Sequence, residues 1–148
     1  MWLFPIEVGS IRLIKYIGEE KHMKFARWTF RTAGIFGLIV AVPMLFVEKL
    51  IEQIMPPSVN HPEFFYGFVI LNICWQILYL FLARDPIRFR PMMIPSFFAK
   101  ASGPVALMWL YLQGRISSQW ITTTILDGVF AILFLLSFWA TRRETVSN

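Results

Sequence analysis

Residues 64–83 constrain this chain more than any other stretch, because they form an uncharged run that ends directly before Arg84, Asp85 and Pro86. A helix rises about 1.5 Å per residue, so a run of this length covers about 30 Å, the thickness of a bilayer's hydrocarbon core. The composition agrees, since 57% of the residues are hydrophobic and only 16% are charged, whereas a soluble domain has roughly 25% charged residues. The sequence therefore predicts an integral membrane protein.

Three more apolar segments have the length of a membrane span, at residues 28–47, 94–112 and 120–139. The connections between the four segments are short, and 148 residues leave no room for an additional soluble domain of ordinary size. We therefore expect a single all-α domain over residues 1–148, in which spans at about 28–47, 64–83, 94–112 and 120–139 pack as a four-helix bundle.

Residues 1–26 precede the first span and have a different pattern. Aliphatic side chains gather on one side of a helix, namely Ile6, Ile11, Leu13, Ile14 and Ile17. Basic side chains gather on the other side, namely Arg12, Lys15, Lys21 and Lys24. Trp2 and Phe4 supply aromatic anchors. This pattern predicts a short amphipathic helix that lies in the headgroup layer. The alternative is a partly ordered tail.

Lysines and arginines are distributed unequally between the two sides that four spans create. Eleven of the fourteen fall on one side and two, Lys49 and Arg115, on the other, while Lys100 lies within a span. Loops rich in Lys and Arg stay in the cytoplasm, so the sequence predicts a multi-pass protein of the cell membrane with both termini cytoplasmic. The net charge of +5 is then explained by orientation and by anionic lipid, and it does not indicate nucleic acid.

Three of these arginines, Arg84, Arg88 and Arg90, follow the central run within a few residues. Asp85 before Pro86 is typical of an N-cap with proline in the first helical position, which predicts one helical turn at the membrane surface. We expect the three arginines to bind lipid phosphates there.

The first span carries small residues at every fourth position, namely Ala33, Gly37 and Ala41. This spacing places them on one helical face, where a neighbouring helix can approach closely. Pro43 is expected to kink the outer end of the span, because proline lacks the backbone N–H that a helix needs.

Four polar side chains within the apolar segments form a candidate polar core. Asn72 and Gln76 are one helical turn apart in the central run, and Lys100 and Asp127 lie in the third and fourth spans. Their distances from the span ends, at about 1.5 Å per residue, put Asn72 level with Asp127 and Gln76 level with Lys100. An acid and a base inside a membrane indicate either a binding site or proton path, or a neutralised pair that fixes helix packing.

Side chains near this polar core suggest what it binds. Trp75, Tyr79 and Trp109 supply aromatic surface, and Thr123 lies on the side of Asp127. The first hypothesis is a non-enzymatic protein that binds a lipid-like molecule, an isoprenoid or a quinone in the bundle. The second is an accessory subunit of a larger membrane complex or a homo-oligomer. The third is a membrane-embedded enzyme or proton-coupled carrier that uses Asp127 and Lys100 as acid and base.

Metal and cofactor chemistry is not predicted. His22 and His61 lie outside the four segments, and Cys74 is the single cysteine. Intramembrane haem ligation and a dithiol mechanism are therefore not expected. The acidic residues around His61 are expected to be solvated loop residues rather than metal ligands.

Overall fold

The protein is all-helical over residues 6–54 and 61–142, which are the residues that its structure, a computed structural model, describes; no strand occurs among them. The helices are α1 (Ile6–Met44), α2 (Glu48–Ile54), α3 (Pro62–Arg84), the 3-10 helix η1 (Arg90–Met92), α4 (Met93–Leu112) and α5 (Gln119–Ala140). Three segments of this described chain are long and apolar enough to cross a membrane, namely Glu20–Met44, Pro62–Arg84 and Trp120–Ala140. The expectation of an all-α membrane protein is confirmed to this extent.

The span predicted at residues 94–112 corresponds to α4, which is not among these three segments. Its length is sufficient, at 20 residues, but Lys100 and the polar or helix-breaking residues around it lower its mean hydropathy. Composition therefore distinguishes α4 from its three neighbours, whereas helix length does not.

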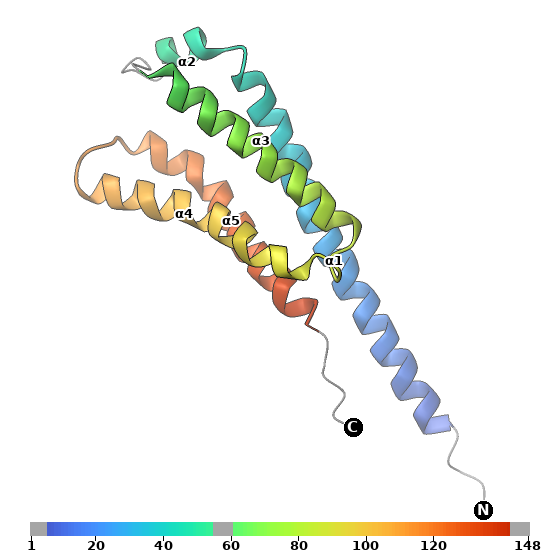
Figure 1. The fold of residues 1–148 in the computed structure, drawn as a ribbon. Coiled ribbons are helices and arrows are strands. Elements are labelled where there is room, and N and C mark those ends of the chain that lie inside the picture. Colours follow the sequence, from blue (N-terminus) through green and yellow to red (C-terminus); the bar gives the residue numbers. More distant parts are fainter. Residues whose placement is uncertain (1–5, 55–60, 143–148) are drawn as a thin grey trace, which may run out of the picture.

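The helices form two antiparallel hairpins rather than a closed four-helix bundle (Figure 1). α1 packs along α3, and α4 packs along α5, whereas the two hairpins contact each other mainly through α1 and α5. Figure 1 shows that the hairpins meet at one end, near the turn between α3 and α4, and diverge toward α2 and the turn between α4 and α5. We call the end near the turn between α3 and α4 the closed end, and the end near α2 and the turn between α4 and α5 the open end.

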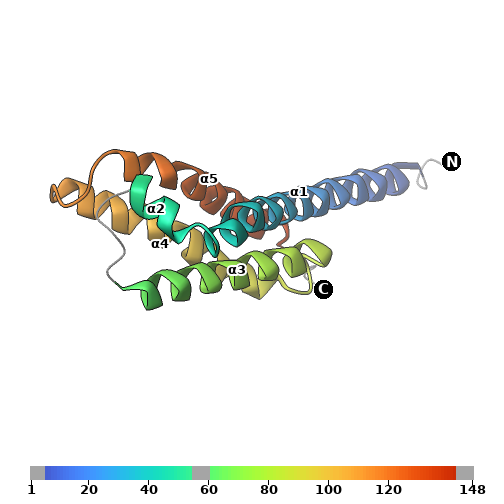
Figure 2. The same cartoon turned by 90° about the horizontal axis from the view of Figure 1, so that it is seen from above.

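The N-terminal half of α1 continues beyond the other helices in both views (Figures 1 and 2). The sequence predicts a separate interfacial helix within residues 1–26, but the structure joins residues 6–26 to the first span as one helix. The sequence has no proline between Pro5 and Pro43 to break it. Trp2 and Phe4, the expected anchors, lie outside the described residues.

Pro43 lies in the last turn of α1, which ends one residue later at Met44. A tight turn follows, in which Phe46 N donates to the Pro43 carbonyl at 2.9 Å, and α2 begins at Glu48. The proline therefore marks the end of the helix, where a kink within it was expected.

Small residues let α1 and α3 approach closely, as their spacing predicts. Ala33 and Ala41 are buried, at 2% and 0% exposed. A Cβ added at Gly37 would collide with the side-chain amide of Gln76, and one added at Gly34 would lie 2.9 Å from the Gln76 carbonyl oxygen. The predicted face is confirmed, and Gly34, which the four-residue spacing does not include, belongs to the same contact.

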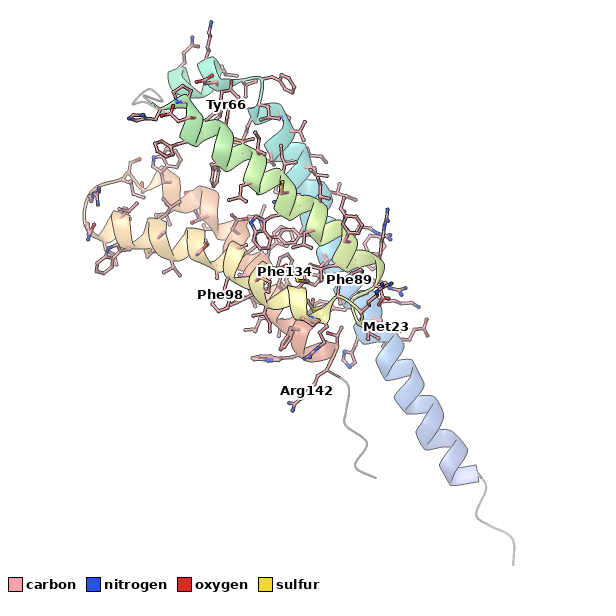
Figure 3. All side chains as sticks on the ribbon, viewed as in Figure 1. Met23, Tyr66, Phe89, Phe98, Phe134 and Arg142 are labelled. Carbon is pink, nitrogen blue, oxygen red and sulfur yellow. The ribbon has the colours of Figure 1, made fainter. Side chains whose placement is uncertain are left out.

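An aromatic cluster joins the two hairpins at the closed end. Phe134 of α5 stacks on Phe30 of α1 at 4.3 Å between ring centroids, and it meets Tyr79 of α3 edge-on at 4.9 Å. Leu82 and Met93 complete this cluster, and all five side chains are 0–1% exposed. Every long helix thus contributes to one contact region (Figure 3, near Phe134 and Phe89).

Arg90 provides a second connection at the closed end. Its guanidinium donates to the carbonyl of Phe138 through Nε at 3.2 Å and Nη2 at 3.0 Å, and it lies 3.8 Å from the centre of the Phe138 ring. That carbonyl belongs to the last turn of α5, where helical partners are missing and a cation is favourable. Arg90 therefore caps α5. The sequence predicts that Arg90 binds lipid phosphate, and it does not predict this contact.

The turn that carries Arg90 begins as its sequence predicts. The Asp85 carboxylate accepts a hydrogen bond from the Arg88 backbone N–H at 3.1 Å, and Phe89 N–H donates to the Asp85 carbonyl at 3.1 Å. Arg84 and Arg88 are exposed, with their guanidinium groups over the rings of Phe81 and Phe89.

Candidate functional site

A cavity of about 290 Å³ lies between the two hairpins, with one wall from α3 and the other from α4 and α5. Its polar lining consists of Asn72, Tyr79, Lys100, Ser102 and Asp127, and its apolar lining of Phe68, Leu71, Trp75, Ala99 and Gly103. Tyr79 belongs both to this lining and to the aromatic cluster. The closed end is therefore continuous with the floor of the cavity.

Lys100 and Asp127 form an ion pair at the wall made by the second hairpin. Lys100 Nζ donates to Asp127 Oδ1 at 2.6 Å, and it also lies 5.9 Å from the centre of the Tyr79 ring. The side chains differ in exposure, at 11% for Lys100 and 43% for Asp127. The ammonium is thus enclosed, while the carboxylate faces the cavity.

Asn72 and Gln76 are paired along α3 in the opposite wall. Gln76 Nε2 donates to Asn72 Oδ1 at 2.6 Å, as expected for amides one turn apart. Gln76 is 1% exposed and lies against Gly37 of α1, and its Oε1 has no hydrogen-bond partner among residues 6–54 and 61–142. Gln76 therefore belongs to the interior of the first hairpin and does not line the cavity.

The two layers expected from depth alone are not the contacts that the structure makes. Lys100 pairs with Asp127, which is the neutralised pair that is one of the two interpretations of the sequence, because a long lysine side chain reaches a level of the bundle away from its Cα. Asn72 and Asp127 do line one cavity, from opposite walls. The polar core is thus divided into one pair in each hairpin.

The remaining predicted site residues have different positions. Trp75 and Tyr79 line the cavity, with ring centroids 6.3 Å apart. Trp109 is 63% exposed and is not part of the lining, because it lies on a lipid- or solvent-facing side of α4. The side chain of Thr123 lies outside what the structure describes.

Several lining residues are absent from the predicted set, Phe68 and Ser102 among them. Phe68 precedes Asn72 by one helical turn, so extending the Asn72–Gln76 face upward would have found it. Ser102 is two positions from Lys100 and therefore lies on a different face of the helix, so the face of Lys100 does not identify it.

Hydrogen-bonding capacity remains at the cavity surface. None of the hydrogen bonds of the described residues crosses from one hairpin to the other there, because the members of each polar pair bond to one another within their own hairpin. The Tyr79 hydroxyl, Asn72 Nδ2 and Asp127 Oδ2 have no protein partner in the part of the chain that is described. These groups can bind the polar part of an occupant.

The arrangement does not resemble a metal site, because no group of three or more His, Cys, Asp or Glu side chains comes together within the described ranges. Comparison of the chain with known protein families, with curated proteins and with solved structures found no match.

Proposed function

We propose that this protein binds a hydrophobic molecule with a polar head, such as a membrane lipid, an isoprenoid or a quinone, in the cavity between its hairpins. The supporting observation is that polar groups of both hairpins face the cavity without bonding across it. Hydrogen-bonding groups without a protein partner, such as the Tyr79 hydroxyl and Asn72 Nδ2, are costly inside a membrane unless a polar partner binds them. The head of the bound molecule is that partner.

The size of the cavity fits the head alone. Its volume of about 290 Å³ is at the lower end of the range for small-molecule sites, roughly 300–1,000 Å³. Phe68 and Leu71 of its lining are 63% and 58% exposed. They provide an apolar path along which a tail continues into the bilayer.

The proposal includes α4 as a fourth span. α4 packs antiparallel along α5, which is apolar enough to cross a membrane. Two helices in contact over their length share the same surroundings. The cost of Lys100 in a membrane is reduced by its ion pair with Asp127 at 2.6 Å.

We further propose that the closed end is cytoplasmic. The exposed arginines Arg84, Arg88 and Arg142 gather there, whereas Lys49 and Arg115 belong to the open end. This distribution agrees with the excess of basic residues on the cytoplasmic side of membrane proteins. Arg84 and Arg88 are then placed to bind anionic headgroups, as are the basic residues of the N-terminal half of α1.

The experiment that tests cavity binding uses two glycines as a matched pair. A Cβ added at Gly103, which lines the cavity, or at Gly67 of α3, which does not, meets nothing within 4 Å. Gly103→Leu should therefore fill the cavity without a clash, and Gly67→Leu should leave it empty.

The measurement is native mass spectrometry of the full chain extracted from membranes. We expect the parent and Gly67→Leu to carry a small amphiphile and Gly103→Leu to lose at least about nine-tenths of it, a tenfold change that corresponds to about 1.4 kcal/mol. A parent without any bound amphiphile, or equal retention by Gly103→Leu, would contradict the proposal.

A further inference from the structure

The cavity wall is formally neutral. Lys100 and Asp127 are the charged side chains among the described residues of the lining, and they neutralise one another at 2.6 Å. A head with a net charge would therefore bring an unbalanced charge into a low-dielectric site, which is strongly unfavourable. An anionic phosphate would also approach the Asp127 carboxylate, which is the more exposed member of the pair.

The unused hydrogen-bonding groups are mainly donors. Asn72 Oδ1 already accepts from Gln76, so its Nδ2 is the free end of the amide. An ammonium has three N–H donors, and that of Lys100 spends one on Asp127. The Tyr79 hydroxyl has no hydrogen-bond partner among the described residues, although Tyr79 is only 1% exposed and lines the cavity.

Fewer of the unused hydrogen-bonding groups are acceptors. Asp127 Oδ2 is the acceptor that the ion pair leaves free, and the Ser102 hydroxyl can act either way. A buried donor without a partner destabilises a complex by about 1–3 kcal/mol. The lining therefore favours an occupant that supplies acceptor oxygens.

Aromatic side chains determine the shape of the site. Trp75 and Tyr79 lie with ring centroids 6.3 Å apart and planes inclined at 36°, both in the α3 wall. Flat rings bind well against such surfaces. The volume of about 290 Å³ suffices for a single substituted ring.

From these observations we infer that the bound head is an uncharged ring with carbonyl oxygens, the chemistry of a quinone, held by hydrogen bonds from Tyr79, Asn72 and Lys100. This inference rests on the proposed function, because it names the class of amphiphile that the same cavity takes.

The test compares three probes of equal chain length on the purified full chain in nanodiscs of zwitterionic lipid. The probes are a decyl-substituted 1,4-benzoquinone, decyl phosphate and decylbenzene, and isothermal titration calorimetry gives each Kd. We expect the quinone to bind at least about tenfold more tightly than the other two probes, since each good hydrogen bond contributes roughly 1 kcal/mol.

Two tyrosines provide the matched variants. Tyr79→Phe keeps the ring in the aromatic cluster and removes only the hydroxyl, so quinone affinity should fall about five- to tenfold. Tyr66→Phe removes a hydroxyl that donates to Glu48 at 2.9 Å, near the start of α3, and should leave the affinity unchanged.

The outcomes separate the inference from the proposed function. Tighter binding of decyl phosphate or decylbenzene, if abolished by Gly103→Leu, would overturn the quinone assignment and keep the cavity as the binding site. Equal quinone affinity in the parent, Tyr79→Phe and Gly103→Leu would overturn both, and so would failure of all three probes to bind a parent that retains no native amphiphile. An unchanged affinity in Tyr79→Phe alone would overturn the role of its hydroxyl.

Discussion

The closed end and the cavity of this protein are adjacent, but they differ in how completely their side chains are packed and hydrogen-bonded. At the closed end, Phe30, Phe134 and Met93 have no exposed surface and every long helix contributes to the contact. In the cavity, Asn72 and Asp127 keep unused hydrogen-bonding groups, and no hydrogen bond of the described residues joins the two walls. Packing is satisfied in one region and left incomplete in the other.

This difference shows where the free energy of folding is located. In a membrane, helices associate through close packing and interhelical polar contacts, because lipid tails are as apolar as the side chains that they replace. The closed end has both, in its aromatic cluster and in the Arg90 contact with the Phe138 carbonyl. Between the walls of the cavity the described residues make no hydrogen bond, so the polar groups there are available for binding.

The largest expected effect is at the centre of the closed end. Phe134→Ala removes a ring that is 0% exposed and contacts Phe30 and Tyr79, and it should lower the free energy of unfolding by about 3 kcal/mol. Phe98→Ala, at a residue that is 62% exposed, is the matched control and should change it little. Unfolding in SDS, followed by circular dichroism, measures both, and similar losses would mean that the closed end does not dominate stability.

A smaller effect is expected at the boundary between the two regions. Gly37→Leu places a side chain where Gln76 now lies, and overpacking of this kind costs about 1–3 kcal/mol. Phe46→Leu, at a residue that is 82% exposed, should be tolerated. The same SDS titration compares them, and equal tolerance at the two positions would show that α1 and α3 do not require this close contact.

The smallest effect is expected at the ion pair in the cavity. Lys100→Met and Asp127→Asn should each reduce stability, and the double variant should recover part of the loss, with a coupling energy of about 1 kcal/mol. The coupling is modest because polar contacts between membrane helices typically contribute only about 1 kcal/mol. A coupling of zero in the double-mutant cycle would show that the pair does not stabilise the hairpin.

The helices were predictable because hydropathy and segment length report directly on the membrane. Residues 64–83 lie within α3 and residues 120–139 within α5, with small differences at the ends. The turn at Asp85 was also predictable, because capping depends on neighbouring residues alone. Local chemistry determines these features, so one sequence suffices to find them.

The arrangement of the helices was not predictable in the same way. Hydropathy gives no preference between a closed bundle and two hairpins that meet at one end, since both expose apolar surface to lipid. Counting basic residues also does not distinguish Arg90, which caps α5, from Arg84, which is exposed. The partner carbonyl of Arg90 is 48 residues away, and only the folded chain brings it near.

The candidate site shows the same limit at the level of single residues. Lys100 and Asp127 were identifiable as charges within apolar segments and as an acid and a base that could neutralise one another, but helix depth measured at Cα did not place them in contact. Trp109 was chosen for its residue type, and it is 63% exposed, because an aromatic residue on a membrane helix is as favourable toward lipid as toward the core. The direction in which a side chain points from the helix axis decides whether it lines the cavity or faces away from it.

The length of α1 has a mechanical consequence. Its 39 residues span about 58 Å, nearly twice the hydrocarbon core. The part before Glu20, where the candidate span begins, is about 21 Å long and has no joint with the part that packs on α3. If the first hairpin tilts by about 10° to admit an occupant, the N-terminal end of α1 moves by about 4 Å, from the length of this lever arm. Because α1 is continuous, a tilt of the first hairpin would be transmitted along it to its N-terminal end.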